Sequence, residues 1–194
     1  MSTPVSISII YDNTSQREDL AADWGFACLV VAHGRRLLFD TGAKGDVLLA
    51  NMKVLSINPA EIGEVLISHD HWDHTGGLEA LLTVNPAMRV WAPTGCQSVP
   101  SGADVVYIDG PHDLSDGLYS TGVLSEIEHS LAIQTQKGVA VVVGCSHPGV
   151  GQILDAASTH GTPHALIGGL HGFDQFDRLS GLSMICPTHC TQHM

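Results

Sequence analysis

Charged and aromatic residues are scarce in this sequence. Asp, Glu, Lys and Arg make up 14% of its 194 residues, against about 25% in an average soluble protein, and the aromatic share is 5%. Only 8 Lys and Arg stand against 20 Asp and Glu, so the net charge of −12 argues against nucleic-acid binding through a basic face. The hydrophobic share of 44% argues against a disordered segment or a coiled coil and favours a compact α/β protein.

CxxC pairs and long apolar runs are also missing. The cysteines number five, an odd count, which fits a reducing compartment better than a disulfide-rich secreted protein. The first residues contain no basic region followed by an apolar stretch, so we expect no signal peptide. The longest apolar run near the start, Phe26–Ala32, is too short to span a bilayer. We therefore expect a cytoplasmic protein that contacts neither membrane nor nucleic acid.

Short apolar runs recur along the chain, and each ends at Gly, Asp, His or Pro, which is typical of β-strands. Clusters of strands separated by single helices predict two sheets that pack together with helices outside them. No linker or repeat interrupts the pattern, so we expect a single domain over residues 1–194. The expected strands are Val5–Ile10, Phe26–Ala32, Arg36–Phe39, Val65–Ile67, Arg89–Trp91, Val105–Ile108, Leu131–Thr135, Val139–Val143, Ala165–Ile167 and Leu182–Ile185, and the expected helices are Gly45–Leu55, Leu78–Leu82 and Val150–Ser158.

Polar residues of a metal-binding kind come just after several expected strands. They are Asp40, His69, His147, His171 and His189. In α/β proteins the ends of strands lie along one edge of a sheet, where sites are normally built, so we expect these residues to gather there. The 12 histidines outnumber Lys and Arg together, and a metal-binding site would explain this excess.

The strongest motif is His-x-His-x-Asp-His, formed by His69, His71, Asp73 and His74. After a strand, residues i and i+2 can converge on one ion, and a tight turn brings i+4 and i+5 to a second. Neutral imidazole and carboxylate are the ligands that zinc prefers, with iron and manganese also able to bind. The alternative interpretation is a set of solvated turn residues.

With their surroundings, these motifs resemble those of the metallo-β-lactamase-fold hydrolases. Asp40 in Phe-Asp-Thr-Gly matches the first family motif, the segment 69–74 the second, and His147 the third. His171 and His189 stand where the fourth and fifth are expected. The resemblance is closer to the branch of dihydropterin-ribofuranosyl-aminobenzene-phosphate synthase-like proteins. The blocks that carry it are Tyr11-Asp12-Asn13, Trp24-Gly25, Leu38-Phe39-Asp40-Thr41-Gly42, Glu128-His129-Ser130-Leu131, Gly144-Cys145-Ser146-His147-Pro148-Gly149, Gly168-Gly169-Leu170-His171 and His189-Cys190-Thr191.

This resemblance implies an αββα sandwich, in which two mixed β-sheets are flanked by helices. Related chains usually continue through a further helix and strand after the fifth motif, so a short C-terminal layer is expected. The resemblance also implies a site for two divalent metal ions, zinc before iron or manganese. The implied ligands are His69, His71 and His147 for the first ion, and Asp73, His74 and His189 for the second.

Some of the residues have more than one expected role. Asp73 would orient a metal-bound hydroxide as well as ligate. His171 stands where many members have a bridging Asp, and one imidazole cannot bridge two ions. It would therefore ligate one ion or act beside the site as an acid or substrate contact. Asp40 either accepts a hydrogen bond from a ligating imidazole or caps the turn after it. Cys145 and Cys190 adjoin implied ligands, although an inert buried cysteine is the commoner interpretation.

The sequence therefore predicts a metal-dependent hydrolase that uses a metal-bound hydroxide on a small ester, lactone or phosphodiester substrate. Within the branch, a pterin- or phosphate-containing compound is expected. One alternative is a non-catalytic metal-binding scaffold of the same fold. A second is a flavodiiron-type redox protein, which would need a carboxylate at His71 and a flavin domain. An apolar flank exposed by a short C-terminal layer would favour a homo-oligomer.

Overall fold

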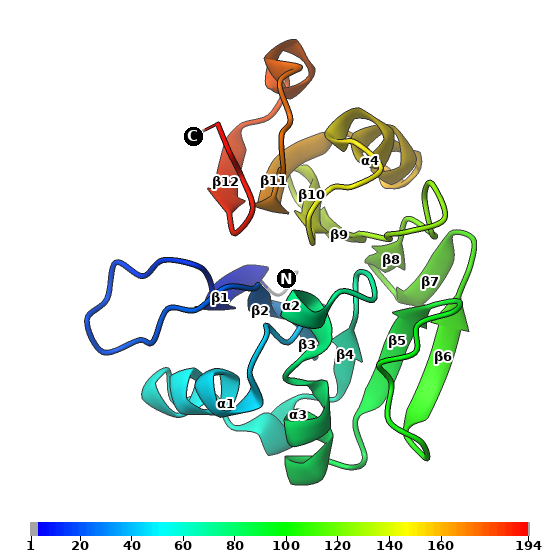
Figure 1. Ribbon diagram of the computed structural model, residues 1–194. Helices are drawn as coiled ribbons and strands as arrows, with labels where there is room; N and C mark the ends of the chain where they lie inside the picture. The colour runs from blue at the N-terminus through cyan, green and yellow to red at the C-terminus, as the bar shows by residue number, and fades with distance from the viewer. Residues whose placement is uncertain (1–3, 194) are drawn as a thin grey trace. The chain divides into compact units, whose positions relative to one another are not determined.

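A computed structural model describes residues 4–193, and within them the strands form two sheets of six strands each. The chain divides into two compact units, residues 1–107 and 108–194. Figure 1 shows the helices and strands, coloured by residue number. None of the helices in the described part of the chain is long and apolar enough to cross a membrane.

The N-terminal unit is built on a mixed sheet with the strand order β1-β2-β3-β4-β5-β6. Strands β1 to β3 pair antiparallel, and β3, β4 and β5 pair parallel. The strands are β1 (Ser6–Tyr11), β2 (Ala27–Ala32), β3 (Arg35–Phe39), β4 (Glu64–Leu66), β5 (Arg89–Pro93) and β6 (Asp104–Ile108), and the helical segments are α1 (Gly45–Val54), η1 (Pro59–Glu61), α2 (Trp72–Thr75) and α3 (Leu78–Val84).

Helices α1 and α3 hold the core of this unit together. They lie side by side (Figure 1), and their apolar residues Leu48, Met52 and Leu81 are fully buried. These side chains join Leu38 and Val65, from the central strands, in one hydrophobic cluster. Burial of side chains of this size stabilises a fold by about 1.5–3 kcal/mol each. The helices therefore anchor the parallel part of the sheet, whose ends carry the histidine motif.

The C-terminal unit has the strand order β12-β11-β10-β9-β8-β7. Strands β7 to β10 pair antiparallel, and β10, β11 and β12 pair parallel. The strands are β7 (His112–Ser115), β8 (Leu118–Ser120), β9 (Leu131–Thr135), β10 (Gly138–Val143), β11 (Pro163–Gly169) and β12 (Met184–Thr188), and the helical segments are α4 (Val150–Ala157), η2 (Ser158–His160) and η3 (Phe176–Leu179).

Helix α4 makes the crossover between the parallel strands β10 and β11. Alternate residues Val139, Val141 and Val143 of β10 join Ile153 and Val150 of α4 in one buried cluster. Alternation of this kind places every second side chain of a strand on the same face of the sheet. This cluster thus lies on the helix side of the sheet, and Leu170 from the loop after β11 belongs to it.

Most of the expected elements are present, with small shifts at their ends. The α/β class is confirmed, and the single-domain arrangement of residues 1–194 stays a prediction. Strands β7 and β8 and the short helix α2 lack an apolar pattern, so the sequence did not predict them. The last strand was expected at 182–185 but runs over Met184–Thr188. It continues through Pro187 because β12 is an edge strand, where a proline can be accommodated.

Candidate metal centre

The histidine motif of the N-terminal unit lies where two parallel strands end. Asp40 follows β3 directly, His69 lies in the loop after β4, and α2 carries Asp73 and His74. Because β3 and β4 are paired neighbours, their carboxyl ends meet at one edge of the sheet. The structure therefore brings these residues together within the unit.

Asp40, which follows β3, is hydrogen-bonded to the loop after β4 and to α2. Its carboxylate is fully buried and accepts hydrogen bonds from the Ser68 backbone N–H (2.7 Å) and the Ser68 hydroxyl (2.8 Å). His74 Nδ1 lies 2.7 Å from Asp40 Oδ2, and since a carboxylate can only accept, this nitrogen carries the proton. Of the two roles expected for Asp40, contact with an imidazole of the motif is the one that the structure contains.

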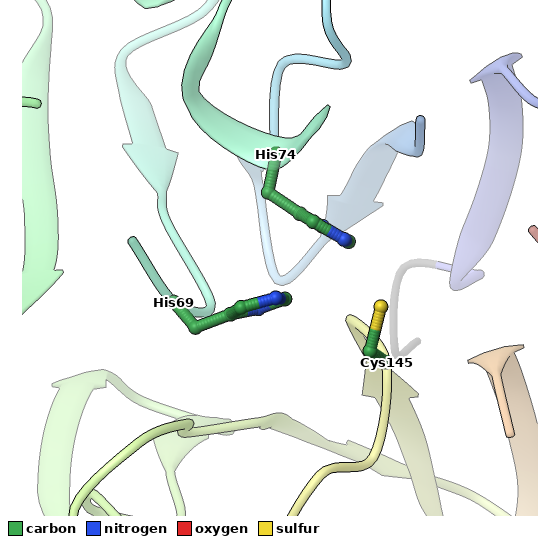
Figure 2. Close-up of side chains that lie close together, drawn as sticks. All are labelled: His69, His74 and Cys145. Carbon is green, nitrogen blue, oxygen red and sulfur yellow. The ribbon is translucent and has the colours of Figure 1, made fainter. Parts of the chain in front are cut away.

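Ser68 determines which ring nitrogen of His69 carries the proton. The Ser68 hydroxyl donates to Asp40, so His69 Nδ1, 2.8 Å from Ser68 Oγ, must be the donor in that contact. In neutral imidazoles a proton on Nδ1 leaves the lone pair on Nε2. Figure 2 shows the rings of His69 and His74 reaching from two segments toward the same space. The centroids of the two rings lie 4.1 Å apart. His69 also lies 4.5 Å, centroid to centroid, from His71.

Asp73 is held by a residue that the sequence did not assign to the site. The indole Nε1–H of Trp24 donates to Asp73 Oδ2 at 2.9 Å. The Asp73 carbonyl accepts from Phe26 N–H, and a Cβ on Gly25 would lie 2.6 Å from that carbonyl oxygen. A glycine with φ of 141° thus lets segment 24–26 lie close against α2. The Trp24-Gly25 pair was noticed only as part of the family resemblance.

In the C-terminal unit, Glu128 organises the loop that carries His147. The Glu128 carboxylate is fully buried, and its Oε2 accepts from the His147 backbone N–H at 2.9 Å and lies 3.0 Å from His147 Nδ1. Its Oε1 accepts three further backbone N–H groups at 3.0 Å, those of Gly144, Cys145 and Ser146. Four successive amides therefore surround one carboxylate, and His147, like His74, carries its proton on Nδ1.

His171 and His189 follow the parallel neighbours β11 and β12. Both have left-handed backbone, with φ of 47° and 49°, as do Asp40 and Ser146 with 57° and 61°. Non-glycine residues adopt this region rarely, and such strain is concentrated at functional sites. The rings of His171 and His147 lie 5.5 Å apart, centroid to centroid, so the structure places these two expected site residues together.

Two cysteines lie beside His189. One ligand atom each of Cys145, His189 and Cys190 lies within 4.8 Å of the others. A hydrogen bond with Cys145 lowers the pKa of the Cys190 thiol to about 5, against the opposing effect of burial, and His171 and His189 lower it further. Cys145 is buried and Cys190 is half-buried. The inert role expected for these cysteines stays a prediction.

The donor set of each unit suits a divalent metal ion. The imidazoles of His69, His74 and His147 each use Nδ1 to contact a hydroxyl or carboxylate, which leaves the lone pair of the neutral ring on Nε2. Metal-binding histidines almost always have such a partner on the other ring nitrogen, because it fixes the tautomer and the ring orientation. Imidazole and carboxylate oxygen are ligands suited to zinc. The residues therefore fit metal binding on chemical grounds.

Two sequence comparisons link the chain to known proteins. The family model of the anti-Pycsar protein Apyc1 matches residues 21–89, a segment that includes β3, α1 and the histidine motif. The 7,8-dihydropterin-6-methyl-4-(beta-D-ribofuranosyl)-aminobenzene-5'-phosphate synthase of Methanocaldococcus jannaschii is 28% identical, and the match covers 81% of this chain and 76% of that protein. The similarity to this synthase thus extends over most of both chains.

Solved structures support the same relationship. The crystal structure of Tm1679, a metal-dependent hydrolase of the β-lactamase superfamily, matches with a TM-score of 0.78 and 26% identity, over 96% of this chain and 88% of that one. A quorum-quenching N-acyl homoserine lactone hydrolase shares the fold with a TM-score of 0.57 and 14% identity, over 87% of this chain and 93% of that one. As the sequence predicted, the chain has the metallo-β-lactamase fold, and it is similar to Tm1679 and to a dihydropterin-ribofuranosyl-aminobenzene-phosphate synthase.

Proposed function

We propose that the protein is a metal-dependent hydrolase that acts on a small ester, lactone or phosphodiester substrate. The observation that carries this proposal is the tautomer assignment of His69, His74 and His147, whose Nδ1 contacts leave Nε2 as a metal ligand. The similarity to Tm1679, described as a metal-dependent hydrolase, supports it. The similar Methanocaldococcus jannaschii protein is named a synthase, so its name supports an enzyme of this fold rather than hydrolysis itself.

The proposed cofactors are two divalent ions, zinc before iron or manganese. Bound ions would supply Lewis acidity toward a carbonyl or phosphoryl group and would activate water. The buried carboxylates of Asp40 and Glu128 would keep the ligating imidazoles in the required orientation. The proposed ligands are His69, His71 and His147 for one ion and Asp73, His74 and His189 for the other.

Asp73 and His171 are the proposed catalytic residues. Asp73, held at Oδ2 by Trp24, would orient the attacking water as well as ligate. His171 is exposed and lies beside His147, which supports a role as an acid or a substrate contact. Ligation of one ion by His171 is the other proposed role. Either role would require the imidazole to stay where the left-handed backbone after β11 places it.

The test is metal content together with turnover. Purified without chelator or added metal, the protein is expected to hold about two equivalents of zinc, iron or manganese and to cleave a generic phosphodiester or lactone. His69→Ala and His147→Ala should each lose most of the metal and nearly all activity. His112→Ala, which removes an exposed histidine of β7, should change neither. Full metal content in His147→Ala would refute the ligand assignment, and full loading without turnover would favour a non-catalytic scaffold.

Substitution of Trp24 tests the same proposal through a partial loss of metal affinity. Trp24→Phe keeps an aromatic ring but removes the N–H that contacts Asp73 Oδ2. We expect metal affinity to fall by about 10-fold, the lower end of the range for partners of ligating groups, with little change in stability. Competition with a chromophoric chelator measures this affinity. Trp91→Phe removes an indole N–H bound to Glu64 instead, so it serves as the control and should keep the wild-type affinity.

The remaining proposals concern partners and location. A net charge of −12 supports a small-molecule substrate over long RNA or DNA, and the name of the similar synthase supports a pterin- or phosphate-containing one. Met184 and Ile185 are 50% and 39% exposed on the edge strand β12, which supports a homo-oligomer. None of the five cysteines is in a disulfide, which supports the cytoplasm.

A further inference from the structure

The thiols of Cys145 and Cys190 meet at the edge of the C-terminal sheet. Cys145 lies in the loop after β10, and His189 and Cys190 follow β12 directly. Strands β10 and β12 are the two parallel neighbours of β11, so their ends point to the same edge. One ligand atom of each of the three residues lies within 4.8 Å of the others.

The backbone around the two thiols is closely packed and hydrogen-bonded. A Cβ on Gly169, at the end of β11, would lie 2.7 Å from Cys190 Sγ and 3.4 Å from Cys145 Cα, so only a glycine leaves room for the thiol there. The Thr191 hydroxyl accepts from Leu170 N–H at 3.0 Å and donates to the Thr188 carbonyl at 2.8 Å. These bonds attach the turn after β12 to the end of β11.

We propose that Cys145, His189 and Cys190 form a ligand set for a thiophilic divalent ion such as zinc, within the C-terminal unit alone. Two thiolates and an imidazole select soft and borderline ions over magnesium or calcium. A tetrahedral ion bound by three protein ligands keeps a fourth position open for water or another ligand. The set goes beyond the proposed hydrolase, because it needs no residue of the N-terminal unit. It shares His189 with that site, and since one imidazole lone pair binds one ion at a time, an ion bound here would replace the second hydrolase ion rather than add to it.

Cobalt(II) reports on this set directly, because thiolate ligation produces a charge-transfer band in the near ultraviolet. The probe is cobalt(II) added to the reduced, full-length chain after removal of metal with a chelator. The wild-type chain should develop the band, and zinc should displace it. Cys145→Ser and Cys190→Ser should each lose most of the band while keeping the far-ultraviolet circular dichroism of the wild type. Cys186→Ser, which changes a half-buried thiol of β12, should keep the band.

His69→Ala separates this inference from the proposed hydrolase. That variant should lose activity and keep the cobalt–thiolate band, since its histidine lies in the other unit. Activity without a band in the wild-type chain would overturn the inference and leave the hydrolase standing. A band that disappears in His69→Ala would overturn it as well, because the thiols would then serve the hydrolase site. If the serine variants fail to fold, protection of Cys145 and Cys190 from iodoacetamide by zinc replaces them as the readout, and equal alkylation with and without zinc would refute the proposal.

Discussion

Replacement of Glu128 by alanine is expected to destabilise the protein by about 3–5 kcal/mol, because several buried donors lose their acceptor together. The change leaves four successive backbone N–H groups buried without their acceptor and releases His147 from its carboxylate. Each such orphaned donor costs about 1–3 kcal/mol, although neighbouring losses do not add. Urea denaturation followed by circular dichroism measures the free energy of unfolding.

Glutamine variants show whether the carboxylate itself is responsible. Glu128→Gln keeps one oxygen for the three amides bound to Oε1, but its NH2 group would face the two donors of His147. We therefore expect a loss smaller than in Glu128→Ala. Glu126→Gln makes the same chemical change at an exposed neighbour and should leave the free energy of unfolding unchanged. An unfolding midpoint of Glu128→Ala equal to that of the wild type would refute the structural role of this carboxylate.

Asp40→Ala is expected to lower both stability and metal affinity. The substitution removes the acceptor of the Ser68 hydroxyl and of His74 Nδ1, and it places alanine at a φ of 57°, where a left-handed backbone costs about 1–2 kcal/mol. With the lost hydrogen bonds, we expect a destabilisation of about 3–5 kcal/mol. Zinc affinity should fall about 10–100-fold, as for other partners of ligating imidazoles. Urea denaturation and chelator competition measure the two effects.

Asp40→Asn separates these two effects. Asparagine tolerates the left-handed region and keeps an oxygen for the Ser68 backbone N–H, so most of the stability should remain. Its NH2 group, at the position of Oδ2, would donate to His74 Nδ1 and move the imidazole proton to Nε2. A protonated Nε2 cannot ligate, so metal affinity should fall as far as in Asp40→Ala. Wild-type zinc affinity in this variant would contradict the tautomer assignment.

Local patterns in the sequence predicted most of the fold. Buried strands such as β10 read as continuous apolar runs, and α4 carries apolar residues at helical spacing, so both were expected near their observed bounds. Strand β7, with the sequence HDLS, has no such pattern, and its pairing with β8 shifts register between Asp113 and Ser115. Its position therefore depends on neighbouring strands rather than on its own residues, which a reading of local pattern does not capture.

In the candidate site, too, local spacing revealed some residues, whereas others depend on contacts between distant parts of the chain. The histidines at 69, 71 and 74 fall within six residues, so their spacing alone indicated metal binding. Glu128 lies 19 residues from the histidine that it contacts, and Trp24 lies 49 residues from Asp73. A buried glutamate and a solvated one look alike in a sequence. Only the left-handed turn at Ser146, which points successive amides at one oxygen, turns Glu128 into an organising residue.

The left-handed residues that follow β3, β11 and β12 also affect how tightly an ion is held. Asp40, His171 and His189 are fixed in an unfavourable backbone region by the strands before them and by hydrogen bonds after them. The conformational entropy of these loops is therefore lost when the chain folds, before any ion arrives. An ion that binds to such preorganised side chains meets little further entropic opposition, so its affinity reflects the ligand bonds more directly than in a site that must first be ordered.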